Sequence, residues 1–476
     1  MNIFRIYGSK ENTIASGSAF ELLNSSQNPV ADLWYGGKTT TRNSISRHLI
    51  QFDLSGLESR LDSKEINADY VSAYKLKFTN CIPSDTVLDT EYEFDILNKK
   101  VAASFDLIAF PINKSWDEGR GFDLTEQHLI IRSKGSYTDL TGYSNWISAT
   151  SSTDWDEPGI FTDPTGSTAV TNYVSQHFAI GSENLEMDVT DIVKDWLSGG
   201  SDNNGMALSY SRPFELESAD TRFISSFYTN KTNTSFKPYL EVQYDQVIKD
   251  DRHQVANNRT SRLFLYLFSG NSAVNFYSAG TVSITTNADV DVYTGLTPVN
   301  HSKGVYYVDV LMSGTTKGQA YKDVWQDITF QSGVDVQTFT QKFTIKGNYY
   351  TNSNKELDDY IISSYGIDND EALLPGEVRR VFINARMNYS LKKPIVDYGL
   401  EYRMTMNNVD EVIPWTQVNS TIINGCYQPF FDVDTSWLLD NQTYEIIFRA
   451  NNFGAKKILE ERINFKVIDS FTKVKA

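Results

Sequence analysis

Short runs of alternating hydrophobic and polar residues most limit how this chain can fold. The segment PYLEVQYD places Leu240, Val242 and Tyr244 on one side of an extended strand, and GVYYVDVLMSG, TYEIIFRANN and ERINFKVID repeat the alternation. Such runs, bounded by Gly, Asn, Ser or Asp, are typical of half-buried strands in antiparallel sheets. With 40% hydrophobic residues, the chain has enough apolar material for packed cores. The sequence therefore predicts an all-β protein.

One segment, MDVTDIVKDWLSGG, departs from strand alternation and has the period of a helix. We expect a short amphipathic helix that begins after Asp188, as its N-cap, and ends at Gly199. We expect its apolar stripe to cover one end of a β-sandwich. The stripe consists of Val189, Ile192, Val193, Trp196 and Leu197.

A chain of 476 residues is too long for one core, so several domains are expected. Alternation gives way to charged and amide residues in two places, which indicates connecting segments. The predicted organisation is a β-domain over 1–245, a linker over 246–261, an immunoglobulin-like (Ig-like) β-sandwich over 262–350, a linker or arm over 351–377, and a second Ig-like β-sandwich over 378–476.

Several motifs in the first 245 residues follow one another in an order known from a β-domain family. They are SRHLIQFDLSGL, INADYVSAYKLKF, SWDEGRG, NWISATSSTDWDEPG, LEMDVTDIVKDWLSG, NNGMALS and KPYLEVQYD. Together they resemble DNRLRE-type domains, a jelly-roll family of secreted and surface proteins. The resemblance covers about half of the chain. It implies a jelly-roll β-sandwich and a structural or carbohydrate-binding role, and it implies no defined active site.

The triplet Trp-Asp-Glu occurs twice, in SWDEGRG and in DWDEPG. A glycosidase needs two carboxyl groups roughly 5 to 9.5 Å apart around one sugar ring, whereas neighbours such as Asp117 and Glu118 point to opposite faces of a strand. The resemblance implies that both motifs are loop-to-strand corners in which Trp116 and Trp155 are packed. We therefore predict structural corners. A catalytic pairing of Glu118 with Asp156 is the alternative.

Other candidate sites carry weaker signals. The five histidines show no metal or nucleophile spacing, and no nucleotide-binding or hydrolase motif occurs. The segments SDNNG (201–205) and GIDNDE (366–371) offer oxygen ligands of the kind calcium prefers, but we interpret them as turns. We therefore expect no cofactor, no metal and no enzymatic activity. Trp34 and Tyr35 precede two glycines and are the candidate glycan contact, although we favour core packing for them because most aromatic residues must be buried.

The charge, the cysteine content and the N-terminal sequence limit which partners and which cellular compartment we expect. There are 43 Lys and Arg residues against 60 Asp and Glu, a net charge of −17, which opposes nucleic-acid binding. No apolar stretch is long enough to span a membrane. Cys81 and Cys426 are too few for a disulfide framework. The start MNIFRIYGSKENT lacks the features of a signal peptide, so we expect synthesis and assembly in a bacterial cytoplasm.

These features favour a protein that acts through shape and contact. We interpret the chain as a structural component of a tailed-bacteriophage virion, a tail or collar (neck) ring protein that contacts copies of itself and other tail, neck and fibre proteins. The residue usage is similar to that of AT-rich genomes, including crAss-like phages. The alternative is a carbohydrate-binding adhesin that recognises a cell-surface glycan through the first domain. A glycan-cleaving enzyme is a third candidate.

Overall fold

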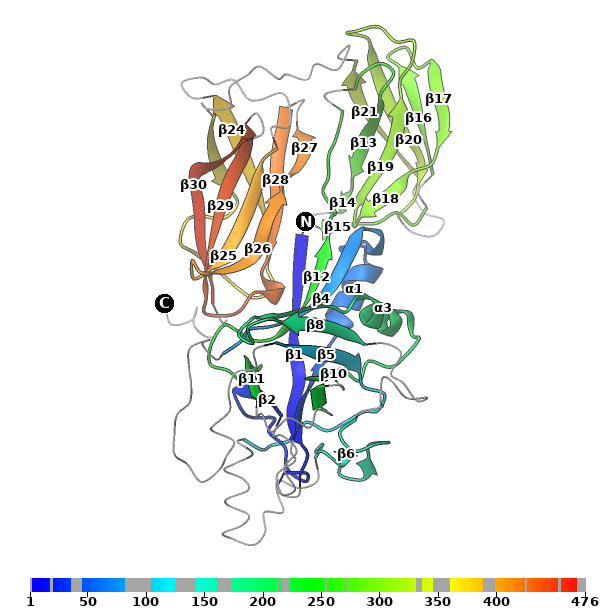
Figure 1. Ribbon diagram of the computed structural model, residues 1–476. Helices are drawn as coiled ribbons and strands as arrows, with labels where there is room; N and C mark the ends of the chain where they lie inside the picture. The colour runs from blue at the N-terminus through cyan, green and yellow to red at the C-terminus, as the bar shows by residue number, and fades with distance from the viewer. Residues whose placement is uncertain are drawn as a thin grey trace. The chain divides into compact units, whose positions relative to one another are not determined.

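The chain is all-β, and its strands form several mainly antiparallel sheets in this computed structural model, with β23 and β30 as a parallel pair (Figure 1). The structure describes residues 2–17, 20–35, 45–81, 104–122, 124, 143–160, 173–211, 214–215, 223–252, 255–269, 272–278, 280–330, 336–345, 360–387, 399–423, 426–452 and 455–468. The all-β fold class is therefore as predicted.

The chain forms two compact units. One, called unit 1 below, comprises residues 1–3, 59–71 and 244–476, and the other, unit 2, comprises residues 4–58 and 72–243. The chain passes between the units at four positions, the last of them between Gln243 and Tyr244. A short stretch of the N-terminal half, residues 59–71, thus belongs to the unit formed by the C-terminal half, which the sequence analysis did not predict.

Unit 2 is built around an antiparallel sheet with the strand order β8-β5-β10-β3-β1-β12-β4-β9. Its strands are β1 (Asn2–Ala15), β3 (Ser46–Phe52), β4 (Val71–Phe78), β5 (Phe105–Pro111), β8 (Val174–Phe178), β9 (Leu185–Asp188), β10 (Met206–Tyr210) and β12 (Tyr239–Tyr244). Two small pairs accompany it: β2 (Val30–Tyr35) with β11 (Phe223–Tyr228), and β6 (Ser148–Thr150) with β7 (Thr153–Asp154). The long strand β1 shifts register between Gly8 and Lys10, and pairs with β3 beyond that point.

A ladder of alternating charges crosses four neighbouring strands of this sheet. Arg5 on β1 lies 3.5 Å from Glu241 on β12, whose carboxylate also lies 3.0 Å from Lys77 on β4. Lys77 and Lys75 share Glu186 on β9, at 3.4 and 2.6 Å. Arg5 and Glu241 are buried, and each charge meets an opposite one, as burial of charged groups requires.

The predicted amphipathic helix is confirmed as α3 (Thr190–Ser198), but its N-cap is Val189, which makes no side-chain capping bond, and not Asp188 as predicted. The carboxylate of Asp188 accepts hydrogen bonds from the amide and the hydroxyl of Thr190, at 3.1 and 2.5 Å. Gly199 closes the helix in the left-handed conformation, φ 74°, which costs glycine little. A second helix, α1 (Ser55–Asp62), was not predicted. It is short, and Leu57 is its one buried residue, so it carries almost no periodic signal.

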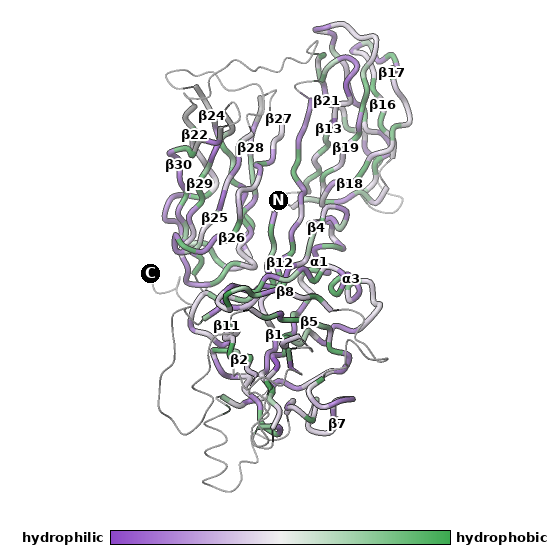
Figure 2. Tube along the Cα trace, in the orientation of Figure 1, coloured by the Kyte–Doolittle hydropathy of each residue, from purple (hydrophilic) through white to green (hydrophobic). Residues whose placement is uncertain are grey.

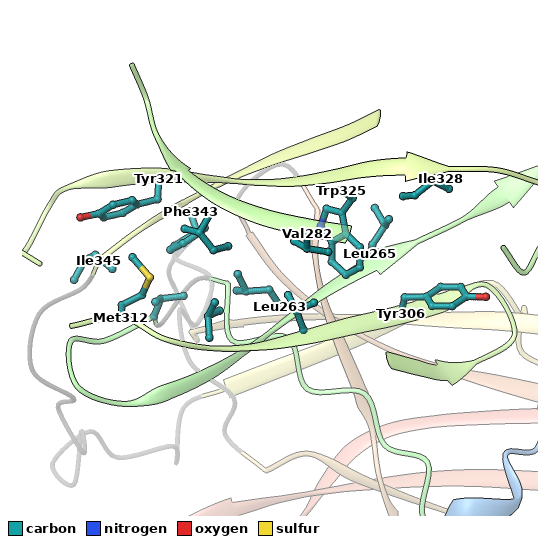
Figure 3. Packing of buried hydrophobic residues seen from close by; sticks show 14 of the residues in the cluster. Leu263, Leu265, Val282, Tyr306, Met312, Tyr321, Trp325, Ile328, Phe343 and Ile345 are labelled. Atoms are coloured by element: carbon teal, nitrogen blue, oxygen red, sulfur yellow. The ribbon is translucent and has the colours of Figure 1, made fainter. Parts of the chain in front are cut away.

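The first Ig-like sandwich of unit 1 packs a three-stranded sheet, β13-β19-β18, against a four-stranded sheet, β17-β16-β20-β21. The strands are β13 (Thr260–Tyr266), β16 (Thr281–Thr286), β17 (Asp291–Leu296), β18 (Val299–Ser302), β19 (Val305–Leu311), β20 (Ala320–Ile328) and β21 (Gln337–Thr344), with the small pair β14 (Phe268–Ser269) and β15 (Ser272–Ala273). Their inward side chains meet around the fully buried Trp325 (Figure 3).

The second sandwich pairs β22-β24-β28-β27 with β23-β30-β29-β25-β26. The strands are β22 (Tyr360–Tyr365), β23 (Glu371–Leu373), β24 (Val378–Met387), β25 (Glu401–Met406), β26 (Asp410–Gln417), β27 (Asn419–Ile423), β28 (Cys426–Asp434), β29 (Thr443–Asn452) and β30 (Ala455–Val467). Hydrophilic and hydrophobic residues alternate along these strands (Figure 2).

The predicted arm over 351–377 is wrong for residues 360–377, because β22 and β23 lie there and belong to the second sandwich. Ile362, Ile367 and Leu373 are buried although acidic and Ser residues surround them in sequence. Residues 351–359 lie outside the described part of the chain.

Residues 246–252 of the predicted linker lie between β12 and β13 outside the named strands, but they do not form an exposed connection. Gln246, Ile248, Asp250 and Arg252 are all buried. Their polar groups bond to residues far away in sequence, as described below. A local sequence pattern does not show these partners, so it predicts an exposed connection.

Replacing Trp196 with Ala should lower the free energy of unfolding by about 3 to 5 kcal/mol, because its indole is buried under α3. Chemical denaturation measures the loss. Leu197→Ala on the same helix, at a half-buried position, is the matched control and should cost clearly less. A loss below about 1 kcal/mol for Trp196→Ala would show that the side chain is not part of a core.

Candidate functional site

The two tryptophan corners meet in one apolar cluster of unit 2. Trp116 and Trp155 are both buried and pack with the same aliphatic side chains, including Ile14 of β1. The indole N–H of Trp116 donates to the carbonyl of Asn204 at 2.8 Å. The indole N–H of Trp155 donates to the carbonyl of Asn145 at the same distance. Both rings thus have an apolar body in the core and a satisfied polar edge.

The acids of the two motifs lie in different surroundings. One carboxylate oxygen of Glu118 accepts a hydrogen bond from the amide of Glu11 at 3.1 Å and lies 3.2 Å from Lys231. Asp156 is exposed and pairs with Lys114 at 2.6 Å. Hydrogen bonds, first from Lys114 and then from Asn113, hold the pKa of Asp156 below its usual value. Each acid therefore has its own structural partners.

The backbone of Asp117 supports the first corner. Its N–H donates to the carbonyl of Ala149 at 3.0 Å, and its carbonyl accepts from the hydroxyl of Ser144 at 2.7 Å. These bonds join the SWDEGRG loop to the segment that carries the second motif. The corners are thus held together by backbone contacts in addition to their shared core.

A run of four polar residues on β1, Lys10 to Thr13, organises the same region. The ammonium of Lys10 donates to the carbonyl of Trp116 at 2.6 Å and lies 4.4 Å from the centre of its ring. The side-chain amide of Asn12 donates to Ser144 and accepts from the amide of Ser25 at 2.9 Å. These contacts bind the corners and a neighbouring loop to one strand.

Thr13 completes the run inside the core. Its hydroxyl lies 3.1 Å from Nδ1 of His48 on β3, and the other ring nitrogen of His48 has no hydrogen-bond partner. Burial lowers the pKa of His48 to about 3. The imidazole is therefore neutral at physiological pH and acts as a packed, weakly polar ring beside Phe78.

Glu11 is the acid of this region whose pKa is shifted furthest from its usual value. One carboxyl oxygen accepts from the amide of Asn230 at 2.6 Å, and the other is buried without a partner. Burial raises the pKa of Glu11 to about 8, and the hydrogen bond from Asn230 and the charge of Lys231 oppose the rise. Burial also lowers the pKa of Lys10. At neutral pH Glu11 is therefore mostly a neutral acid.

A neutral acid next to a second carboxyl group, that of Glu118, resembles the arrangement of glycosidases. The side chain of Glu11 is only 1% exposed, however, which leaves no space for a sugar ring against it. Its contacts instead tie the register shift of β1 to the loop at Asn230, whose side-chain amide also donates to the carbonyl of Gly8 at 2.5 Å. The sequence analysis missed the whole run, although it belongs to five successive polar residues, Ser9 to Thr13, which were a visible signal.

The candidate glycan contact at Trp34 and Tyr35 is wrong, because both side chains lie in the core. Trp34 is 5% exposed and packs edge-on against Phe20, with ring centres 6.1 Å apart. Tyr35 is 2% exposed and packs against Phe214 at 5.6 Å. Neither ring offers a free face on which a sugar could stack.

The segments considered for calcium use their side-chain oxygens in hydrogen bonds within the protein. Asn203 accepts from the amide of Gly205 at 3.1 Å, and Asn369 accepts from the amide of Asn464 at 2.9 Å. Among the residues that the structure describes, no three His, Cys, Asp or Glu side chains gather as metal ligands would. Within the same ranges, no helix has the length and apolarity needed to cross a membrane.

No family model and no curated protein matches this chain, so the resemblance to DNRLRE-type domains stays a prediction. Among solved structures, a chimeric titin tandem is similar at 9% identity over 46% of this chain and 94% of its own, with a TM-score of 0.15. The N-terminal Ig1-2 module of a Drosophila receptor protein tyrosine phosphatase is similar at 11% identity over 45% and 93%, also with a TM-score of 0.15. An Escherichia coli alpha-2-macroglobulin covers 46% of this chain and 20% of its own, at 10% identity and a TM-score of 0.17. Scores this low carry no functional argument.

Replacing Glu11 with Gln should remove a pH dependence of stability. The pKa of Glu11 is raised in the folded state, so the folded chain holds this proton more tightly and loses stability as the pH rises toward about 8. The slope for one such group is about 1.4 kcal/mol per pH unit. Denaturation at about pH 5 and about pH 9 should show a flatter profile for Glu11→Gln, with higher stability than wild type at the upper pH.

The control for this measurement is Glu118→Gln, which removes the neighbouring, partly exposed carboxylate. It should leave most of the pH dependence in place. Equal profiles for wild type and Glu11→Gln would contradict the assignment of the buried proton to Glu11.

Proposed function

We propose that this chain is a structural component of a tailed-bacteriophage virion, a tail or collar ring protein that contacts copies of itself and fibre proteins. The observation that carries the proposal is the bracing within unit 1. Two segments outside the sandwich strands, residues 59–71 and 246–252, are bonded to the sandwiches through polar groups.

The first brace, residues 59–71, reaches both sandwiches. Arg60 lies 2.7 Å from Asp434 and donates to the hydroxyl of Ser436 at 2.8 Å, next to the end of β28. Glu65 lies 2.8 Å from Lys303, between β18 and β19 of the first sandwich. Because one short segment holds both, a relative movement of the sandwiches would have to break these pairs.

Asn67 lies at the centre of the first brace. Its side-chain amide donates to the carbonyl of His301 at 3.1 Å, and its backbone amide donates to the side-chain oxygen of Gln246 at 2.8 Å. Gln246 donates in turn to the carbonyl of Glu65 at 3.0 Å. The two braces are therefore hydrogen-bonded to each other.

The second brace, residues 246–252, continues along the edge of the second sandwich. The amide of Ser420 on β27 donates to the carbonyl of Ile248 at 3.0 Å. The side chain of Ile248 packs in an apolar cluster with Phe264, Val305 and Phe430. This cluster takes residues from both sandwiches, so the brace contributes apolar as well as polar contacts.

Arg252 anchors the end of the second brace inside the first sandwich. Its guanidinium pairs with the buried carboxylate of Asp323 and donates to the carbonyl of Phe264 at 2.9 Å. Asp323 also accepts from the indole of Trp325 at 2.8 Å. A charge buried this deeply needs these partners, and removing one partner of a buried pair is strongly destabilising.

A braced pair of sandwiches suits a protein that holds position under load, which supports the virion proposal. The acidic composition and the series of β-domains support it too. The adhesin alternative loses the one contact that sequence analysis offered for it, since Trp34 and Tyr35 are buried. The tail or collar position and the ring remain parts of the proposal.

Purified virions test the proposal. Mass spectrometry of particles from a phage that encodes this chain should find it at a fixed ratio to the other tail proteins, and washing in high salt should not remove it. A chain found only in the soluble lysate would refute the virion role and put the adhesin first.

A further inference from the structure

Several sheet edges of unit 1 are covered by specific contacts. Ser420 on the edge strand β27 bonds to Ile248, as described above. Asn67 covers carbonyls of β18, and the backbone amide of Ser364 on β22 donates to the carboxylate of Glu461 at 2.8 Å. Such devices keep an edge from pairing with a strand of another chain.

The edge strand β21 has no such cover. It pairs with β20 on one side, and no described residue outside that pair hydrogen-bonds to residues 337–344 on the other. The pairing with β20 is regular from Phe339 to Thr344. The opposite edge of the same sheet, β17, is interrupted by two register shifts, and such bulges disfavour further pairing. Among the described residues, β21 is thus an edge strand whose outward backbone groups have no hydrogen-bond partner.

The sequence of β21 is close to self-complementary. In TFTQKFT, residues 338–344, an antiparallel copy centred on Gln341 places Phe339 opposite Phe343, and Thr338 opposite Thr344. Thr340 then lies opposite Lys342. Cross-strand aromatic pairs stabilise a sheet. Phe343 is in the core of the first sandwich and Phe339 packs at its margin, so this pairing would extend the apolar core.

Charge also suits this pairing. The chain has a net charge of −17, which opposes self-association in general. Strand β21 carries no acidic residue, and Lys342 is its single charge. In the register centred on Gln341, the two copies of Lys342 each face a threonine, so no like charges lie directly opposite each other.

We propose that β21 is a homotypic docking edge: it pairs antiparallel with β21 of a second copy, centred on Gln341, and joins the two four-stranded sheets across a two-fold axis. A two-fold contact uses the same surface on both subunits, as a self-complementary edge does. This inference stands whether or not the chain belongs to a virion.

Charge substitutions at Thr340 test the register. Thr340→Glu places a carboxylate opposite Lys342 of the second copy, twice per dimer, and should tighten the dimer by on the order of threefold to tenfold. Thr340→Lys places like charges there and should weaken it by a similar factor. Sedimentation velocity over a concentration series gives the dissociation constants. Thr294→Glu and Thr294→Lys, on the exposed edge strand β17, are the matched controls and should change little.

Cross-linking tests the centre of the pairing. In a background with Cys81→Ser and Cys426→Ser, Gln341→Cys places two thiols directly opposite each other, at a spacing that a disulfide can bridge. Mild oxidation should give a covalent dimer much faster than for Thr294→Cys. A wild-type chain that is monomeric at the highest soluble concentration, or equal cross-linking by the two cysteine variants, would overturn the proposal. Equal effects of Glu and Lys at position 340 would overturn the register.

Discussion

The buried guanidinium of Arg252 is the interaction on which the bracing of unit 1 depends. Its partner Asp323 is fully buried among the side chains of the first sandwich, and the two residues are 71 positions apart. An unpaired carboxylate at that place would cost several kcal/mol. The core of the first sandwich therefore requires residues 246–252 to be held against it, and these residues in turn bond to the second sandwich through Ile248.

Asp250 gives this anchor a further constraint. Burial raises the pKa of Asp250 to about 6, and the charge of Arg252 opposes the rise. Arg252 thus lies between two carboxyl groups, those of Asp250 and Asp323. If Asp250 is protonated, the guanidinium still has Asp323 as a partner. Burial opposes the charge of Arg252, but Asp323 and Asp250 together hold the pKa of its guanidinium above the usual value.

Local patterns predicted the elements whose burial depends on neighbours in sequence. Strands such as β12 and β30 alternate with period two, and α3 has a helical stripe with a glycine at its end, so each could be recognised alone. The braces could not, because Arg60, Asn67 and Arg252 are polar residues whose partners lie far along the chain. A polar side chain is predicted to be exposed unless its partner is known.

The candidate site shows the same limit. The aromatic corners at Trp116 and Trp155 were singled out from their repeated motif, but the polar run on β1 that holds them was not, and the suggested sugar contact at Trp34 and Tyr35 is part of the core. A sequence shows that an aromatic residue is present, whereas its exposure depends on which loops fold over it, here those that carry Phe20 and Phe214.

Amide hydrogen exchange within the braces tests the central claim, that unit 1 behaves as one braced body. The amides of Asn67 and Ser420 donate to Gln246 and to Ile248 respectively. If the braces hold, both amides exchange as slowly as those of the central strand β28, because they open only when the sandwiches open. Exchange at the rate of an exposed loop, while β28 stays protected, would show that the braces are not bound and would contradict the account.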